Sequence, residues 1–207
     1  MNTFEVAAGV RFWPGRLSAT DQVALLAEVM SRVGVAPFFQ PTMPGTGKKF
    51  SVEMTNFGPL GWVSDRLRGY RYERLHPITG SSWPQIPQSL LQLWAETTGY
   101  DAPPEACLVN FYRAGARMGL HQDADESATD APVLSLSLGD TALFRFGTAG
   151  RRGQTRSLKL ASGDLLMFGG PARMMYHGVD RVQAGSSSLI PGGGRINLTL
   201  RRVSPIG

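Results

Sequence analysis

The chain has 207 residues, of which 42% are hydrophobic and 18% charged, as is ordinary for one globular domain with a substantial core. Its net charge of +5 permits a polyanionic partner without requiring one. The single cysteine, Cys107, excludes an internal disulfide and suits a reducing cytoplasm. No apolar run approaches the ~18 residues of a membrane span, and no secretory signal is recognisable at the N-terminus. We expect a cytoplasmic protein without a membrane segment, and a monomer.

The first part of the chain is predicted to contain one helix and one strand. Residues 1–17 include Phe-Trp-Pro-Gly, which indicates an irregular segment with a turn. Residues 18–33 begin with a polar N-cap region and continue with apolar residues at helical spacing, and Gly34 is predicted to end this helix. Residues 50–55 alternate between polar and apolar, which is typical of a strand.

A basic and aromatic segment occupies residues 40–74. Between Arg66 and Arg74, four arginines are interleaved with two tyrosines, and Trp62 precedes them. Such a pattern suits a surface that binds phosphates and stacks on bases. The alternative is an exposed hairpin with solvated charges, and the local pattern alone favours this alternative.

The rest of the chain is predicted to form a second helix and then short strands. Pro87 can occupy the first turn of a helix over residues 88–98, which Gly99 closes. The candidate strands are Cys107–Tyr112, Arg117–His121, Val133–Leu138, Ala142–Phe146, Thr155–Leu160, Leu165–Phe168, Met174–His177 and Arg195–Arg201. Eight short strands joined by tight turns indicate a jelly roll. We therefore predict an α+β fold, a double-stranded β-helix with supporting helices, as a single domain over residues 1–207.

Two of the three histidines indicate a metal site. His121 and Asp123 are two residues apart, so in an extended segment their side chains point to the same side. His177 follows a strongly apolar run and supplies a third candidate ligand. Two imidazole nitrogens and one carboxylate make the facial triad of non-haem Fe(II) oxygenases. For each histidine alone, a core or surface histidine is the usual explanation.

The last predicted strand has a strongly polar face. Alternation places Arg195, Asn197, Thr199 and Arg201 on one side of the strand and three apolar residues on the other. Two arginines are costly to bury unless an anion meets them, and a guanidinium matches the geometry of a carboxylate. We therefore expect this face to bind a dicarboxylate, with one arginine at each end.

Taken together, these motifs resemble the AlkB-type Fe(II)/2-oxoglutarate-dependent dioxygenases over roughly residues 40–202. His-x-Asp alone arises often by chance, but the distal histidine and Arg-x-Asn-x-x-x-Arg at family spacing make the resemblance specific. The segments that carry it are Asn110–Tyr112, Leu120–Glu126, Ser135–Gly139, Phe144–Gly147, Gly163–Asp164, Tyr176–Gly178 and Arg195–Arg201. The resemblance implies an N-terminal nucleotide-recognition lid over about residues 40–75 and a β-helix catalytic core over about residues 105–202.

The resemblance also implies cofactors and a reaction. His121, Asp123 and His177 would hold Fe(II) and form the catalytic centre. The implied contacts to the co-substrate 2-oxoglutarate are Arg195, Tyr112 and Asn197 at its distal carboxylate, and Asn110 and Arg201 at the carboxylate next to the keto group. The implied reaction uses O2 to demethylate bases such as 1-methyladenine and 3-methylcytosine, which repairs DNA directly and releases formaldehyde, succinate and CO2.

The implied partner is single-stranded or flipped-out alkylated DNA, with RNA as an alternative. A base that cannot pair normally costs less to extrude from the stack. Trp62 would stack on that base opposite the His121 ring, and Tyr70 would contact the nucleic-acid backbone. Asp125 would offset the positive charge of the alkylated ring, and Arg151 would lie on the substrate side.

Other functions stay open on the sequence alone. The same iron chemistry could act on protein or lipid, or the chain could be a non-catalytic nucleic-acid-binding β-domain. The basic stretch from residue 48 to residue 74 favours nucleic acid. Lys48–Phe50 replaces the tyrosine and methionine that the resemblance leads us to expect in the lid, so strand preference and adduct range are undetermined. Asp125 and Glu126 could also be solvated turn residues.

Overall fold

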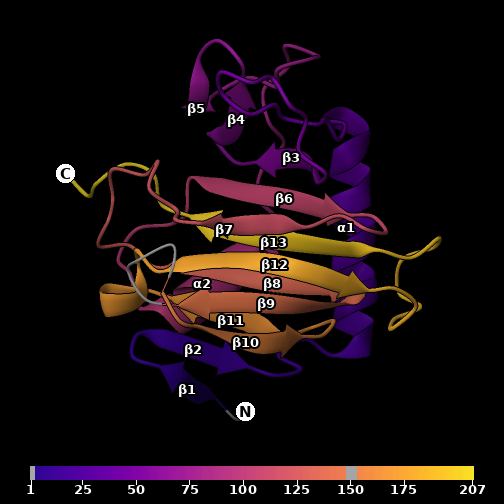
Figure 1. Cartoon of the computed structure of the whole chain (residues 1–207), viewed down its shortest axis with the longest axis vertical. Helices are drawn as coiled ribbons and strands as arrows, with labels where there is room; N and C mark the ends of the chain where they lie inside the picture. Colours follow the sequence, from indigo (N-terminus) through magenta and orange to yellow (C-terminus); the bar gives the residue numbers. More distant parts are fainter. Residues whose placement is uncertain (1–2, 148–152) are drawn as a thin grey trace.

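The computed structural model describes residues 3–147 and 153–207, so Arg151 lies outside the described residues. Two antiparallel sheets form the body of the molecule, and a separate hairpin lies beyond one end of them (Figure 1). The larger sheet has the order β1 (Phe4–Ala7), β2 (Val10–Trp13), β11 (Leu165–Phe168), β8 (Val133–Gly139), β13 (Arg195–Arg201), β6 (Ala106–Tyr112) and β3 (Glu53–Phe57). The smaller sheet has the order β10 (Thr155–Leu160), β9 (Thr141–Gly147), β12 (Tyr176–Gln183) and β7 (Met118–His121), and the hairpin pairs β4 (Gly61–Asp65) with β5 (Gly69–Glu73).

Two helices, α1 (Ala19–Val35) and α2 (Gln88–Thr98), support the outer face of the larger sheet (Figure 1). Apolar side chains of both helices, among them Leu25 and Trp94, pack against Leu198 and its neighbours in one buried cluster. The hydroxyl of Ser18 caps α1 by accepting a hydrogen bond from the backbone N–H of Asp21 at 3.2 Å. The predicted α+β jelly roll with supporting helices is confirmed.

The second core lies between the two sheets. It joins side chains of the larger sheet, such as Leu166 and Phe168, to Phe144 and Phe146 of the smaller sheet. The alternation predicted for β13 is confirmed, because its apolar residues enter the helix-facing core while its polar residues line a cavity on the other side. Since the whole strand is buried, its polar side chains must find partners inside the protein or in a ligand.

Some predicted elements are wrong, and the strand predicted over residues 50–55 is instead β3, which runs from Glu53 to Phe57. Residues 1–17 are not irregular, because β1 and β2 form a hairpin and β2 pairs with β11, some 150 residues away in the chain. Helix α1 continues through Gly34 to Val35. The strand predicted to end at His177 instead runs from Tyr176 to Gln183, with an irregularity between Val179 and Arg181 that interrupts its alternation.

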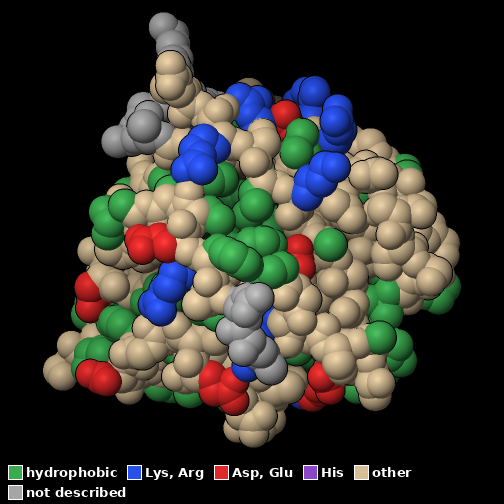
Figure 2. Space-filling view, turned by 90° about the horizontal axis from the view of Figure 1, so that it is seen from below, with side chains coloured by type: hydrophobic (Ala, Val, Ile, Leu, Met, Phe, Trp, Pro, Cys, Tyr) green, Lys and Arg blue, Asp and Glu red, His purple; other side chains and the backbone are tan. Residues whose placement is uncertain are grey.

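The surface at the β1 end mixes apolar and basic side chains. Figure 2 looks onto this end from below and shows apolar side chains near the centre with Lys and Arg side chains above them. Phe4 of β1 is one of the half-exposed apolar residues. Exposed apolar groups of this kind are common on folded proteins. Among residues 3–147 and 153–207, no helix has the length and apolar character that a membrane crossing needs.

Gly61 fixes the start of the hairpin because it leaves no room for a side chain. A Cβ at this position would lie 2.4 Å from the ring of Trp83 and 2.8 Å from the Cβ of Asn56. The Asn56 amide also accepts from the backbone N–H of Trp62 at 2.9 Å and donates to its carbonyl at 3.0 Å. A side chain at Gly61 therefore disturbs the next residue as well, Trp62, which lines the cavity.

We predict that Gly61→Ala lowers the free energy of unfolding by about 1–3 kcal/mol, because the new methyl group overpacks a buried contact. Urea unfolding followed by circular dichroism measures this change. The matched control is Gly34→Ala in α1, where an added Cβ meets nothing within 4 Å. This control should be neutral or stabilising by up to about 1 kcal/mol. Equal destabilisation by both substitutions would contradict the packing argument.

Candidate active site

Neighbouring strands of the smaller sheet bring the predicted triad together. His121 ends β7, and its antiparallel pairing partner on β12 is His177. The two imidazole rings lie 4.5 Å apart between centroids. Each histidine Nε2 atom is 3.7 Å from one carboxylate oxygen of Asp123. The ligand atoms of all three residues lie within 4.8 Å of one another, a spacing that fits one metal ion.

Backbone carbonyls orient both imidazole rings. The Nδ1 atom of His121 lies 2.9 Å from the carbonyl oxygen of Gly119, and that of His177 lies 3.2 Å from the carbonyl oxygen of Met175. A carbonyl oxygen can only accept a hydrogen bond, so the proton of each ring belongs on Nδ1. Each Nε2 atom then keeps a free lone pair, as a metal ligand requires.

The electrostatics of the triad favour the protonation states of metal ligands. Burial alone would raise the pKa of Asp123, but the positive charge of Arg201 outweighs it and lowers the pKa to about 2. Burial lowers the pKa of His177 to about 4, against the attraction of the Asp123 carboxylate. At neutral pH the site therefore offers a charged carboxylate and a neutral His177 imidazole.

A cavity of about 730 Å³ contains the triad and reaches both the interior and the hairpin. It is lined by every predicted site residue that the structure describes, and the metal ligands are joined there by Asn110, Tyr112, Arg195, Asn197, Arg201, Trp62, Tyr70 and Asp125. The polar side chains of β13 thus face the same space as the metal ligands.

Arg195 has unsatisfied donors inside this cavity. Its side chain is 1% exposed, and its Nη2 atom donates to the hydroxyl of Ser137 at 2.9 Å. Its Nε and Nη1 atoms have no hydrogen-bond partner among the described residues. The guanidinium carbon lies 5.2 Å from the centroid of the Tyr112 ring. A buried cation with free donors in a cavity fits an anionic ligand such as one carboxylate of 2-oxoglutarate.

The site contains two more unsatisfied polar atoms, and one of them fits the implied metal. One carboxylate oxygen of Asp123, Oδ2, has no hydrogen-bond partner among the described residues, and the same holds for Oδ1 of Asn110. A metal ion would satisfy the first atom. Asn197 differs, because its amide group already bonds to Ser135, Leu136 and Thr199. The donor set as a whole fits Fe(II) with 2-oxoglutarate.

Arg201 lies nearer the metal ligand than the sequence indicated. Its Nη2 atom donates to Oδ1 of Asp123 at 2.9 Å, and its Nη1 atom donates to Oε1 of Glu126 at 3.0 Å. Only Nε is left without a partner among the described residues. Arg201 therefore neutralises two buried carboxylates and has limited capacity for a further anion.

Glu126 and Arg173 are functional candidates that the sequence did not identify. Glu126 is not a solvated turn residue, because it is 4% exposed and lies between Arg201 and Arg173. Arg173 was not singled out, although an arginine within the apolar stretch from Leu165 to Met175 was a usable signal. Arg173 is 3% exposed, and its Nη2 atom donates to Glu126 at 3.0 Å.

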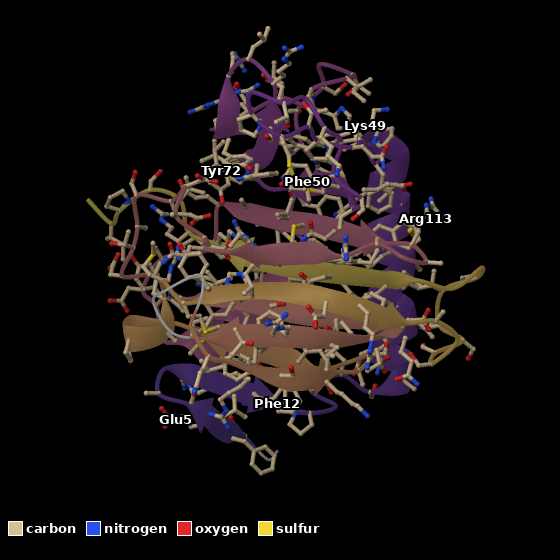
Figure 3. The ribbon with its side chains drawn as sticks, viewed as in Figure 1. Glu5, Phe12, Lys49, Phe50, Tyr72 and Arg113 are labelled. Carbon is tan, nitrogen blue, oxygen red and sulfur yellow. The ribbon has the colours of Figure 1, made fainter. Side chains whose placement is uncertain are left out.

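The hairpin side of the cavity is aromatic and basic. The Trp62 ring stacks on Tyr70, with centroids 5.4 Å apart and planes inclined by 25°, and Phe50 meets its edge at 6.2 Å. The indole Nε1 of Trp62 donates to Asp125 at 2.7 Å. Lys49 also lines the cavity, and Figure 3 shows Lys49 and Phe50 in the segment next to β6.

Comparisons with known proteins agree with this geometry. The family model of the 2OG-Fe(II) oxygenase superfamily matches residues 9–201. The alpha-ketoglutarate-dependent dioxygenase AlkB homolog of Caulobacter vibrioides is 55% identical over 197 residues, which cover 95% of this chain and 89% of the relative. The alpha-ketoglutarate-dependent dioxygenase AlkB of Escherichia coli K12 is 42% identical over 182 residues, covering 86% and 83% respectively. The solved structure of OsALKBH1 matches with a TM-score of 0.82 and 29% identity, over 97% of this chain and all of that one.

We predict that the metal-free protein loses stability as the pH falls from 6.5 to 4. In this range His177 stays neutral in the folded state but gains a proton in the unfolded chain, so the unfolded state binds more protons. A folded pKa of about 4 against 6.5 corresponds to a loss of about 3 kcal/mol over this range. Urea unfolding with a chelator present, repeated at several pH values, measures the slope. His177→Asn should flatten it, and an unchanged slope in this variant would assign the effect to other groups.

Proposed function

This chain belongs to the 2-oxoglutarate–Fe(II) oxygenase superfamily and to its AlkB-type members, and from this premise we propose that it demethylates N-alkylated bases in DNA. The family predicted from the sequence is confirmed, and the enzyme uses Fe(II) with 2-oxoglutarate as its co-substrate. Bases of the 1-methyladenine and 3-methylcytosine type are its substrates. The products are the restored base, formaldehyde, succinate and CO2, so the reaction repairs DNA by direct reversal.

One observation carries this proposal. A single cavity contains the His121, Asp123 and His177 triad, the buried Arg195 with free donors, and the stacked Trp62 and Tyr70. Bound Fe(II) supplies the activation of O2 that the oxidation of a methyl group needs. The protein's own groups hold the co-substrate and the base close to that centre and exclude bulk water from it.

We place 2-oxoglutarate along the polar face of β13. Arg195, with Tyr112 and Asn197 beside it, receives the distal carboxylate, because its two free donors match a carboxylate that lacks another partner. Asn110 and Arg201 lie at the carboxylate next to the keto group, and the Nε donor of Arg201 is a buried atom without a partner among the described residues. Arg201 also neutralises Asp123, so its role is shared between the co-substrate and the metal ligand.

We place the alkylated base between the hairpin and the triad. Tyr70 covers one face of the Trp62 ring, so the base stacks on the other face, towards His121. Asp125 offsets the positive charge of the alkylated ring and holds the Trp62 indole in place. Tyr70 contacts the nucleic-acid backbone, and Arg151 belongs to the substrate side. The lysines at 48 and 49 add positive charge on this side, which favours binding of phosphates.

The segment from about residue 40 to 75 acts as the nucleotide-recognition lid, and the segment from about residue 105 to 202 forms the catalytic core. Both belong to the single domain 1–207. The substrate is single-stranded or flipped-out DNA, with RNA as an alternative. The enzyme works as a monomer in the cytoplasm. One wall of the cavity has aromatic and cationic residues, which favour a nucleic-acid substrate. They argue against the alternative in which the same iron chemistry acts on protein or lipid.

The test is a demethylation assay on an oligonucleotide that contains 3-methylcytosine. With Fe(II), 2-oxoglutarate and O2 present, we expect formaldehyde and succinate in equal amounts and recovery of cytosine. Parallel assays on single-stranded DNA, duplex DNA and RNA establish the preferred substrate. His121→Ala should abolish both products. Succinate formation without formaldehyde or base recovery on all three nucleic acids would overturn the assignment to nucleic acid.

We predict that Arg195→Ala raises the dissociation constant of 2-oxoglutarate at least about tenfold, because a hydrogen bond to a charged group contributes roughly 1.5–3 kcal/mol. Anaerobic calorimetric titration of the Fe(II)-loaded protein measures this constant. Arg145→Ala is the matched control, because Arg145 lies on β9 and pairs with Asp180 and Thr155 outside the cavity. If both variants bind 2-oxoglutarate as the parent does, Arg195 does not contact the co-substrate.

A further inference from the structure

The hairpin contacts the chain just beyond the metal ligand Asp123 through both of its strands. On β4, the indole Nε1 of Trp62 donates to Oδ2 of Asp125 at 2.7 Å. On β5, the hydroxyl of Tyr72 donates to Oε1 of Glu126. Figure 3 shows Tyr72 where the hairpin meets the rest of the molecule. The two acceptors are adjacent in sequence, so the hairpin and the metal-binding segment are joined side chain to side chain.

Glu126 is held rigidly at this junction. Its Oε1 atom accepts from Nη1 of Arg201 at 3.0 Å, and its Oε2 atom accepts from Nη2 of Arg173 at 3.0 Å. Arg173 in turn donates from Nη1 to the carbonyl oxygen of Asp123 at 2.6 Å and from Nε to that of Ala131 at 2.8 Å. The side chains of Glu126, Arg201 and Arg173 are all buried, so a hydrogen bond that Glu126 loses on moving is costly.

Arg201 connects Glu126 to the metal ligand Asp123, because it binds both carboxylates. Its guanidinium is planar and rigid, and it binds Glu126 through Nη1 and Oδ1 of Asp123 through Nη2 at 2.9 Å. A rotation of this plane therefore moves both carboxylates together. The second oxygen of Asp123, Oδ2, is the atom that lies 3.7 Å from Nε2 of His177 and has no hydrogen-bond partner among the described residues.

We propose that Tyr72 and Glu126 are positioning residues that link the seating of a base on the hairpin to the orientation of the Asp123 carboxylate. Tyr70 and Tyr72 are two residues apart on β5 and therefore share one face of the strand. A base that stacks on the other face of the Trp62 ring shifts this ring and the Tyr70 ring stacked on it, and the strand that carries Tyr70 also carries Tyr72, the donor to Glu126. This inference rests on the proposed function, since the base is the ligand that the hairpin receives.

The link has a chemical consequence for the enzyme. When no base is present, the hairpin holds Asp123 in one orientation, and when a base is seated it holds Asp123 in another. Consumption of 2-oxoglutarate is then tied to the presence of the substrate, which limits wasteful turnover. Groups that orient a metal ligand commonly change metal affinity or activity by about ten- to a hundredfold when they are removed.

The test removes one hydroxyl group. Tyr72→Phe keeps the aromatic ring and deletes the hydrogen bond to Glu126, whereas both arginines continue to neutralise that carboxylate. Tyr100→Phe is the matched control, because the hydroxyl of Tyr100 also donates to a carboxylate, that of Asp130 at 3.0 Å, and it does not line the cavity. Thermal unfolding of both variants verifies that they are folded.

Two measurements report on the link between the seating of the base and the orientation of Asp123. The first is the visible absorption spectrum of Co(II) bound in place of Fe(II), with 2-oxoglutarate present, before and after addition of a 3-methylcytosine oligonucleotide. The second is the ratio of formaldehyde to succinate in the Fe(II) enzyme. We expect the oligonucleotide to change the Co(II) spectrum of the parent and of Tyr100→Phe but not that of Tyr72→Phe. We also expect Tyr72→Phe to lower the product ratio by about tenfold.

The outcomes separate this inference from the proposed function. If the parent releases formaldehyde from the oligonucleotide but Tyr72→Phe matches Tyr100→Phe in both readouts, the link is overturned while the function stands. If the parent releases no formaldehyde, the proposed function fails. If the oligonucleotide also leaves the Co(II) spectrum of the parent unchanged, the link between the base and Asp123 is overturned as well. A spectrum that responds in the parent and not in Tyr72→Phe supports the link whatever the product.

Discussion

The buried ion pair between Arg201 and Asp123 is the interaction on which the site depends. It joins the last strand of the larger sheet to the segment that follows β7 of the smaller sheet. Two carboxylates and two guanidiniums are buried here together, so the charges balance, and removal of one member leaves another uncompensated. Breaking such a pair typically costs about 3–5 kcal/mol, even where replacement of the whole group would be neutral. The enzyme therefore holds Asp123, a metal ligand, in place with buried ion pairs that are costly to desolvate.

Much of the fold could be predicted because the strands are short, alternate clearly and end at glycine-containing turns. The helix over residues 88–98 was predicted with its correct ends, since Pro87 and the left-handed Gly99 are local signals. The β1–β2 hairpin was missed because its stability comes from pairing with β11, a contact that no local pattern encodes. The extent of β12 was underestimated because a charged pair, Asp180 and Arg181, coincides with an irregularity in its pairing with β9.

The site was predictable to the degree that its residues follow strand periodicity. His121 ends β7 and Asp123 follows it by two residues, whereas the polar face of β13 follows strand alternation, and the cavity brings them together. Glu126 and Tyr72 lie 54 residues apart, so their contact depends on how the hairpin folds over the sheets. Spacing also could not reveal that Arg201 is occupied by two carboxylates, because an arginine in a strand looks the same whichever acidic group it meets.

The carbonyl groups that orient His121 and His177 have a consequence for metal choice. Since strand pairing and these hydrogen bonds already arrange the ligands, an incoming ion needs little rearrangement of the protein. A ready-made set of two imidazoles and one carboxylate does not by itself reject other divalent ions, and nickel and copper bind such donors more tightly than ferrous iron does. The choice among these ions therefore depends on the geometry of the ligands and on the supply of free ions in the cell, and we expect nickel and copper to compete with ferrous iron for this site.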